Sequence, residues 1–302
     1  MVVYDVLVFG AGQVAAGYDS PDKETILTHA HAILKHKGLN LLGFYDINAE
    51  AAANAAKKWG GQAFEQPVKA DVVAVCTTDD AHLLSVSQAV NLSPKLIVLE
   101  KPIARSIDDM RAIKELAQGI PVLVNFSRRF VPCFRRLAIE AGGFGTFLTG
   151  SGQYGKGFIH NGSHMVDLLR MIVGDVISVE IVDEINDFYS DDPTKSAVLR
   201  FENGCFHMCG VDCRNYTLFE IDLCFEKARV RVLDSGAKVD IYKPVPSEKY
   251  AGYINLALQD TVYPEMDMAM MCLYDNAFNH LANGEPLVLP LSVAYTEVMY
   301  QV

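Results

Sequence analysis

The sequence predicts an α/β part with a parallel sheet up to about residue 125, followed by an α+β part with an open, mainly antiparallel sheet. Three observations support this division. Apolar runs of strand length alternate with helical segments in the first part, which indicates parallel strands covered by helices on both faces. A glycine-rich turn directly follows the first strand. After residue 143, strand-like segments with a hairpin signal replace the alternation.

The first strand ends in a turn of the form G-x-G-x-x-A at residues 10–15. Gly10 permits the tight turn, and Gly12 lets the backbone approach a pyrophosphate that would face the N-terminus of the next helix. Gln13 and Val14 complete the predicted cofactor loop. A plain strand–helix turn can carry the same residues, so the assignment to a Rossmann dinucleotide-binding domain depends on the strands that follow.

The second strand, LNLLGFYD (39–46), ends in an acid. Asp46 can accept hydrogen bonds from the adenosine ribose hydroxyls and would repel a 2′-phosphate, which favours NAD over NADP. The acid lies farther from the glycines than the usual spacing of about 20 residues. We attribute the difference to the polar stretch YDSPDKE (18–24), which is predicted to interrupt the first helix. Alternatively, Asp46 is an ordinary turn residue.

The alternation of strands and helices continues to residue 126. The predicted helices and strands are 49–60, 71–76, 80–91, 95–100, a helix from Ser106, and 121–126. Gly60 is placed to cap the first of these helices, and Ser106 forms a capping-box pattern with Asp109. These features predict a parallel sheet with helices on both faces.

Ligands of such sheets lie beyond the carboxyl ends of the strands, and polar residues gather at those ends here. They are Thr77, Thr78, Asp79, Glu100 and Lys101. Lys101 is held in place because Pro102 restricts the backbone of the residue before it. The alternative for Lys101 is a solvated charge at a strand end.

Charge and composition exclude several classes of partner. A net charge of −11 argues against nucleic acid or an anionic membrane, because such binders carry a basic face. No apolar run approaches the roughly 20 residues of a membrane helix, and the first residues lack the features of a signal peptide. Seven cysteines scattered over 302 residues suggest reduced thiols. We therefore expect a cytoplasmic protein.

The second part is predicted to be rich in strands. Strand-like segments lie at 145–155, 197–213, 217–234 and 237–243, with a hairpin turn at Asn203-Gly204, and helices are predicted at 265–284 and 291–302. The last helix is expected to pack back on the first domain. Cys205, His207 and Cys209 alternate along one strand, but a zinc site needs four converging ligands. We therefore predict no metal site there.

Four motifs resemble, in order and spacing, the Gfo/Idh/MocA family of dehydrogenases. They are TTDDAH (77–82), LEKPIA (99–104), VNFSRRFVP (124–132) and GSHMVDLLRMIVG (162–174). The resemblance implies an NAD(P)-binding Rossmann domain at 1–125 and a substrate-binding and oligomerisation domain at 126–302. It also implies a homodimer or homotetramer that forms through one face of the second sheet.

The resemblance assigns roles to individual residues. Lys101 would contact substrate and nicotinamide, and His164 would exchange the proton of the reacting hydroxyl. Thr77, Asp79 and His82 would lie along the cofactor, with Glu100 beside Lys101.

Two departures from the family pattern bear on the chemistry. The family's common Thr-Pro-Asn is Thr77-Thr78-Asp79 here, and an aspartate that often stands four residues before the catalytic histidine is His160. We therefore assign His160 and Asn161 to polar groups of the substrate. Asp167 is the alternative carrier of the proton relay.

The segment HNGSHMVD (160–167) has three interpretations: a metal site, a proton-transfer site or a polar helix start. The apolar run that follows predicts a helix that begins near residues 162–163, with Asn161 or Ser163 as its cap. His160 would then lie outside the helix, which disfavours a His-x-x-x-His zinc pair. His164 and Asp167 would share a helix face, as proton transfer requires.

Four arginines lie within SRRFVPCFRR (127–136). Arg128 and Arg129, just past a strand end, could clamp a carboxylate or the phosphate of a nucleotide sugar. Arg135 and Arg136 are expected to face solvent or a neighbouring subunit.

The sequence thus predicts an NAD(P)-dependent oxidoreductase that interconverts a secondary alcohol and a ketone on a sugar, cyclitol or nucleotide sugar. NAD is the expected cofactor, NADP less so, and no metal is expected. Two alternatives remain open: a dinucleotide-binding sensor or regulator without turnover, and a reductase of C=N or C=C bonds.

Overall fold

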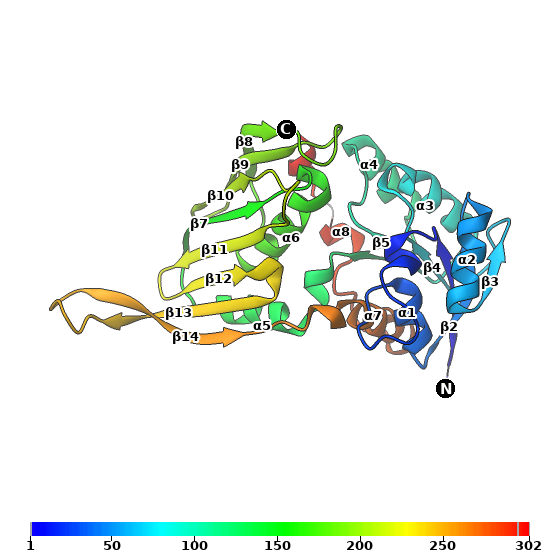
Figure 1. Ribbon diagram of the computed structural model, residues 1–302, viewed down its shortest axis with the longest axis horizontal. Helices are drawn as coiled ribbons and strands as arrows, with labels where there is room; N and C mark the ends of the chain where they lie inside the picture. Colours follow the sequence, from blue (N-terminus) through cyan, green and yellow to red (C-terminus); the bar gives the residue numbers. More distant parts are fainter. Residues whose placement is uncertain (1, 295, 302) are drawn as a thin grey trace. The chain divides into compact units, whose positions relative to one another are not determined.

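The computed structural model describes residues 2–294 and 296–301 (Figure 1). The chain divides into two compact units: the described part of residues 1–130 with 267–296, and that of residues 131–266 with 297–302. Residues 267–296 thus follow the second unit in the chain but belong to the first. As functional domains, the ranges 1–125 and 126–302 stay a prediction.

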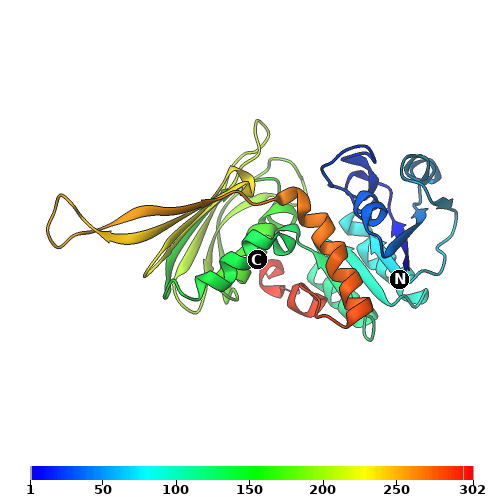
Figure 2. The same cartoon turned by 90° about the horizontal axis from the view of Figure 1, so that it is seen from below.

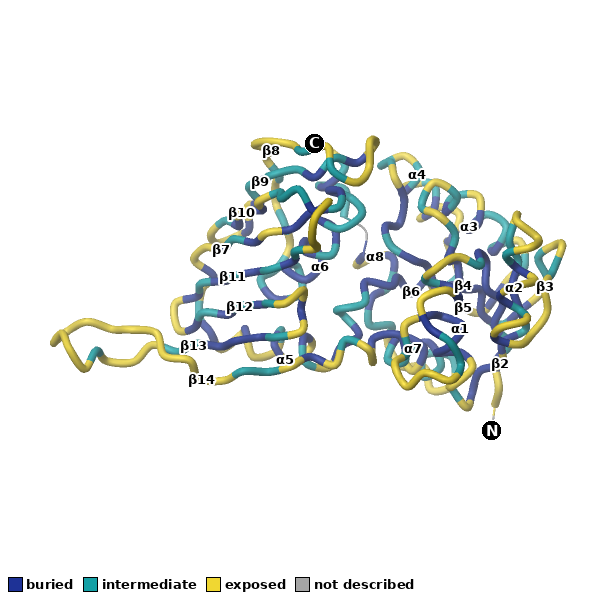
Figure 3. Tube along the Cα trace, in the orientation of Figure 1, coloured by how far each residue is buried: buried dark blue, intermediate teal, exposed yellow. Residues whose placement is uncertain are grey.

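The first unit contains a six-stranded sheet in the order β3-β2-β1-β4-β5-β6, with every pair parallel. The strands are β1 (Tyr4–Phe9), β2 (Leu39–Tyr45), β3 (Gln62–Phe64), β4 (Val72–Val75), β5 (Leu96–Glu100) and β6 (Val122–Asn125). Every residue of β4 and β5 is buried, which is why these strands appear in the sequence as continuous apolar runs (Figure 3). The order is that of a Rossmann fold, which confirms the predicted class.

Helices accompany this sheet. They are η1 (Gln13–Gly17), α1 (His29–Lys35), α2 (Ala49–Trp59), η2 (Asp79–Ala81), α3 (His82–Asn91), α4 (Ile107–Leu116), η3 (Ser127–Phe130), α7 (Ala269–Asn283) and α8 (Leu291–Ala294). Both predicted caps are confirmed. Ser106 accepts a hydrogen bond from the Asp109 amide at 3.0 Å, and Gly60 ends α2 with a φ of 88°.

The helix after the glycine turn is much shorter than usual. It is a single π-helical segment of 5 residues, Gln13–Gly17, and α1 starts only at His29. Between them the chain folds around the buried carboxylate of Asp19, which accepts hydrogen bonds from the Leu27 amide and the Thr28 hydroxyl and pairs with the His31 ring. The prediction that the polar stretch interrupts the first helix is confirmed. The helix whose N-terminus was expected to face the phosphates is therefore the short η1.

The second unit contains an eight-stranded sheet in the order β14-β13-β12-β11-β7-β10-β9-β8. The strands are β7 (Phe147–Tyr154), β8 (Ser178–Ile185), β9 (Thr194–Arg200), β10 (Cys205–Gly210), β11 (Phe219–Phe225), β12 (Arg229–Leu233), β13 (Lys238–Pro246) and β14 (Ile254–Val262). Only the β7–β10 pair is parallel, so the prediction of a mainly antiparallel sheet is confirmed.

Helices cover one face of this second sheet. Figure 2 shows α5 (Pro132–Ala141) and α6 (Ser163–Ile172), in green, against it. Along β10, Phe206 and Met208 are buried, whereas His207 and Cys209 are exposed on the opposite face. The short helices η4 (Phe158–Gly162), η5 (Asp234–Gly236), η6 (Met266–Met268) and η7 (Glu297–Tyr300) complete the elements.

Three strands, β3, β8 and β14, had no counterpart in the sequence prediction. The β13–β14 hairpin projects beyond its sheet (Figure 1), and Ile254, Leu256 and Leu258 on it are all exposed. No core face therefore distinguished β14 in the sequence. The predicted turn at Asn203-Gly204 is confirmed, since it joins the antiparallel strands β9 and β10 with Gly204 at a φ of 75°.

The C-terminal part differs from the prediction of one helix over 291–302. The described residues form two short helices, α8 and η7, while residues 295 and 302 of the predicted helix lie outside the described residues. Ahead of α8, the Leu289 carbonyl accepts a hydrogen bond from the Val124 amide at 3.0 Å, so this segment lies along the edge strand β6. In the part of the chain that the structure describes, no helix has both the length and the apolar character needed to span a membrane.

Candidate active site

A pocket of about 280 Å³ lies at the carboxyl ends of β1, β2 and β4 in the first unit. It is lined by Gly10, Gly12, Tyr45, Asp46, Ile47, Cys76, Thr77, Thr78, Ala81, Leu84, Ser85 and Gln88. Four residues predicted to bind the cofactor therefore meet in one cavity: Gly10, Gly12, Asp46 and Thr77. Gln13 and Val14 follow directly in η1.

The two glycines of the turn serve different purposes. Gly10 has a φ of +86°, and a Cβ there would lie 2.7 Å from the Cys76 carbonyl oxygen, so the close approach of β1 to β4 requires glycine. A Cβ at Gly12 would meet no atom within 4 Å. Packing does not require glycine at position 12, and the space above it opens into the pocket.

Asp46 holds the glycine turn through its carboxylate. Oδ2 accepts a hydrogen bond from the Ala11 amide at 2.7 Å, and Oδ1 accepts one from the Asn48 amide at 2.8 Å. Asp46 therefore acts as a turn residue, which was the alternative to ribose binding, and its side chain also lines the pocket. Both carboxylate oxygens keep further lone pairs for a ligand.

His82 and Asp79 have structural partners. His82 is 1% exposed, and its Nδ1 lies 2.9 Å from the Pro102 carbonyl oxygen while its Nε2 lies 3.2 Å from that of Thr77. Both contacts would be hydrogen bonds only for a charged ring, but burial lowers the pKa of His82, so we assign a neutral ring that donates from Nδ1. Asp79 pairs with Arg105 at 3.0 Å. Neither residue lines the pocket, and their contact with a cofactor stays a prediction.

A buried polar network supports Lys101 from behind. The carboxylate of Glu100 accepts hydrogen bonds from Nε2 of His29 at 2.7 Å and from Nδ2 of Asn125 at 2.5 Å, and it lies 3.3 Å from the Lys101 amide. On its other side, Nδ1 of His29 lies 2.7 Å from the Tyr274 hydroxyl.

The network controls the charge of Glu100. Burial alone would raise the pKa of this carboxyl group, but the hydrogen bonds from His29 and Asn125 and the charge of Lys101 lower it overall. Burial raises the pKa of Tyr274 well above its usual range, so its hydroxyl stays protonated. Glu100 is therefore a buried carboxylate directly before Lys101.

In the second unit, the segment 158–172 is helical throughout, because η4 leads directly into α6. His160 lies outside α6, which begins at Ser163 as predicted, but inside the π-helical turn η4 that precedes it. The predicted cap is wrong: neither helix has a side-chain hydrogen bond at its N-cap, and Nδ2 of Asn161 donates to the Gly155 carbonyl at 2.7 Å. His164 lies in the first turn of α6 and is half-buried, and Asp167 is 5% exposed.

His160 has a carboxylate partner that the sequence did not suggest. Its Nδ1 lies 2.7 Å from Oδ2 of Asp192, and its ring stacks on Tyr189 with centroids 4.0 Å apart. Within residues 2–294 and 296–301, no group of three or more His, Cys, Asp or Glu side chains is arranged to hold a metal ion.

The arginines predicted to clamp an anion follow β6. Arg128 and Arg129 lie in η3 and are half-buried, and the Arg129 amide donates to the Phe126 carbonyl at 2.9 Å. Their role toward a substrate stays a prediction.

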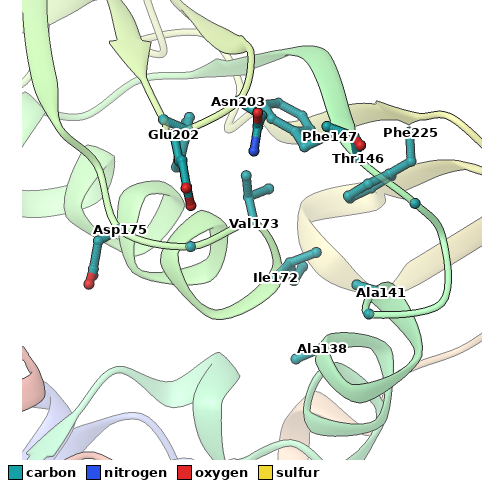
Figure 4. Close-up of a pocket in the computed structure, with 14 residues that line it drawn as sticks. Ala138, Ala141, Thr146, Phe147, Ile172, Val173, Asp175, Glu202, Asn203 and Phe225 are labelled. Atoms are coloured by element: carbon teal, nitrogen blue, oxygen red, sulfur yellow. The ribbon is translucent and has the colours of Figure 1, made fainter.

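A second pocket, of about 370 Å³, lies in the second unit between the ends of α5 and α6 and the β9–β10 turn (Figure 4). Thr146, Glu202 and Asn203 line it together with Phe147 and Phe225. None of the predicted site residues lines this pocket, so we do not assign the chemistry to it.

Several residues of the candidate site were not found from the sequence. They are His29, Asn125, Tyr274, Asp192, Tyr189 and Arg105. Asn125 alone carried a signal, because it ends an apolar strand next to Glu100 in the parallel sheet.

Comparison with known proteins agrees with this geometry. Residues 6–126 match the model of the Gfo/Idh/MocA oxidoreductase family with its NAD-binding Rossmann fold. Glucose-6-phosphate 3-dehydrogenase of Bacillus subtilis (strain 168) is 28% identical over 119 residues, which cover 38% of this chain but only 31% of that protein.

Two solved structures resemble the whole chain. UDP-N-acetylglucosamine 3-dehydrogenase GnnA from Acidithiobacillus ferrooxidans has a TM-score of 0.77 at 16% identity, covering 97% of this chain and 94% of its own. The WlbA dehydrogenase from Bordetella pertussis, solved with NADH and UDP-GlcNAcA, has a TM-score of 0.75 at 19% identity. The match covers 97% of this chain and 92% of the WlbA chain. At such identity these two likenesses concern the fold. The family match coincides with the sheet that carries Gly10, Gly12 and Asp46, so residues 6–126 are similar to the NAD-binding Rossmann domain of the Gfo/Idh/MocA oxidoreductases.

Proposed function

We propose that this protein is an NAD-dependent dehydrogenase that interconverts a secondary alcohol and a ketone on a sugar, cyclitol or nucleotide sugar. The bound nicotinamide supplies the hydride chemistry. Lys101 hydrogen-bonds the reacting oxygen, and His164 takes its proton in oxidation and returns it in reduction, with Asp167 beside it on the same helix. Arg128 and Arg129 serve substrates that carry a carboxylate or phosphate.

The pocket above Gly12 is the observation that carries this proposal. Its rim holds two large apolar side chains, Ile47 and Leu84, that are 96% and 62% exposed. Apolar side chains at the mouth of a pocket with a few polar groups suit a flat ligand such as an adenine ring. Gly12 then faces the pyrophosphate, since its position leaves the space that a side chain would fill.

Asp46 supports NAD rather than NADP as the cofactor. Its carboxylate lines the pocket and is fixed by the Ala11 and Asn48 amides, so it cannot turn away easily from an incoming ribose. A carboxylate in this place accepts hydrogen bonds from ribose hydroxyls and repels a 2′-phosphate.

Calorimetric titration with NAD and NADP tests the cofactor assignment. We expect NAD to bind more tightly than NADP, and Gly12→Ala to weaken NAD binding at least about tenfold, or roughly 1.4 kcal/mol. Gly142→Ala is the control, because it adds the same methyl group at a glycine outside the pocket, where its nearest contact is an ordinary 3.4 Å. Equal NAD binding by both variants and the wild type would contradict the pyrophosphate assignment.

The substrate class follows from the same titration with glucose 6-phosphate, myo-inositol and UDP-N-acetylglucosamine added to the NAD-loaded protein. Binding with NADH formation supports the dehydrogenase. NAD binding without turnover of any sugar would favour the sensor or regulator, and oxidation of NADH by an imine or alkene would favour the C=N or C=C reductase.

We also propose that the chain forms a homodimer or homotetramer in a reducing compartment such as the cytoplasm. The hairpin β13–β14 exposes Tyr250, Tyr253, Ile254, Leu256 and Leu258, a concentration of apolar side chains that favours self-association. All seven cysteines are free thiols, as a reducing compartment maintains. A monomer mass in sedimentation equilibrium at micromolar concentration would contradict the oligomer.

A further inference from the structure

His160 is held by a carboxylate from a different part of the chain. Asp192, in the loop between β8 and β9, accepts a hydrogen bond from Nδ1 of His160 at 2.7 Å. The same carboxylate accepts from the His160 amide at 2.9 Å and from the Ile159 amide at 3.0 Å. The His160 and Asp192 side chains are 17% and 10% exposed, so water screens the pair only weakly.

The local backbone is shaped to admit Asp192. Gly157 has a φ of +88°, and a Cβ there would lie 2.2 Å from Oδ2 of Asp192, so only glycine permits the approach. Tyr189, from the same loop, stacks on the His160 ring with an interplanar angle of 10°. The ring is therefore fixed on one edge by the carboxylate and on one face by the tyrosine.

This arrangement decides which ring nitrogen carries the proton. All the other groups that bind Asp192 here are N–H donors, so Asp192 is the acceptor and Nδ1 of His160 is the donor. In the neutral ring, Nε2 then has the lone pair and can accept a hydrogen bond from a hydroxyl.

We propose that His160 and Asp192 form a dyad in which Nε2 of His160 accepts a hydrogen bond from a substrate hydroxyl, with Asp192 as the positioning residue that fixes the tautomer. The dyad rests on the proposed function, because its ligand is the polyol part of the sugar-like substrate. His160 lies in η4, which leads directly into α6, where His164 lies in the first turn.

A double-mutant cycle tests the dyad with NAD and the sugar that the wild type oxidises. His160→Phe keeps an aromatic ring to stack on Tyr189 but loses the hydrogen bonds, and Asp192→Asn replaces the charged acceptor of the Nδ1 hydrogen bond by a neutral amide. We expect each to lower kcat/KM roughly 10- to 100-fold, the range for a hydrogen bond that involves a charged group, with unchanged NAD affinity. The double variant should be no worse than His160→Phe alone.

Asp187→Asn is the matched control. Asp187 lies in the same loop and accepts hydrogen bonds from the Lys156 amide and the Thr194 hydroxyl, both at 2.9 Å, but no hydrogen bond joins it to the His160 ring. Its variant should keep kcat/KM near the wild-type value.

The outcomes separate the dyad from a purely structural role. If Asp192 served only to bind backbone amides, its replacement would lower kcat/KM further in the His160→Phe background, and this additivity would overturn the proposal. Wild-type kcat/KM in either single variant would overturn it too. A wild type that oxidises no sugar would instead contradict the proposed function, and the dyad's role with it.

Discussion

Replacement of His164 by alanine is expected to lower kcat roughly 10²–10⁴-fold, the usual contribution of general acid–base catalysis. Histidine suits the role because its ordinary pKa lies near neutral pH, so it can take and return a proton in one cycle. NAD affinity should be unchanged, since the residues that line the pocket proposed for the cofactor all belong to the first unit and His164 to the second. Stopped-flow or steady-state NADH absorbance measures kcat, and calorimetry measures the NAD affinity.

His207→Ala is the control for this substitution. His207 is also a histidine of the second unit, but it is exposed, on the face of β10 opposite the buried Phe206 and Met208. Its variant should retain wild-type turnover. If His164→Ala also did so, His164 would have no part in proton transfer and the assignment would pass to another group.

The parts of the fold that could be predicted from sequence are those with a local signal. The continuous apolar runs of β4 and β5 identify buried parallel strands. Gly60 and Ser106 mark helix ends because a cap depends on residues within one turn. The strand β14 has no buried face to leave such a trace, and it was missed.

The candidate site divides in the same way. Gly10, Gly12, Asp46 and Thr77 were predicted together because parallel strands end at one edge of a sheet, and they line one pocket. The partners of Glu100 and His160 lie 71 and 32 residues away in the chain and belong to no periodic pattern. Only the tertiary structure brings these histidines and carboxylates together.

Replacement of His29 by alanine is expected to destabilise the protein by about 1.5–3 kcal/mol, the usual cost of losing a hydrogen bond to a buried charged group. His29 is 0% exposed and Glu100 6%, so the lost hydrogen bond lies in the core, away from bulk water. The Tyr274 hydroxyl loses its partner in the same change. Urea unfolding followed by circular dichroism measures the effect, and Lys35→Ala, an exposed site on the same helix, should be nearly neutral.

The pH dependence of the stability difference between the wild type and His29→Ala tests whether Glu100 is the origin of the destabilisation. Its pKa in the folded protein lies below the ordinary value of 4.5, because the hydrogen bonds and charges around it outweigh its burial. A lowered folded pKa gives stability that is fully present above pH 4.5 and is lost as pH falls through the folded value. The stability gap between the wild type and His29→Ala should therefore be widest near pH 7 and narrow on acidification below about pH 4.5. A gap that stayed constant down to pH 3 would show that His29 contributes through packing alone, and that Glu100 does not depend on it for its charge.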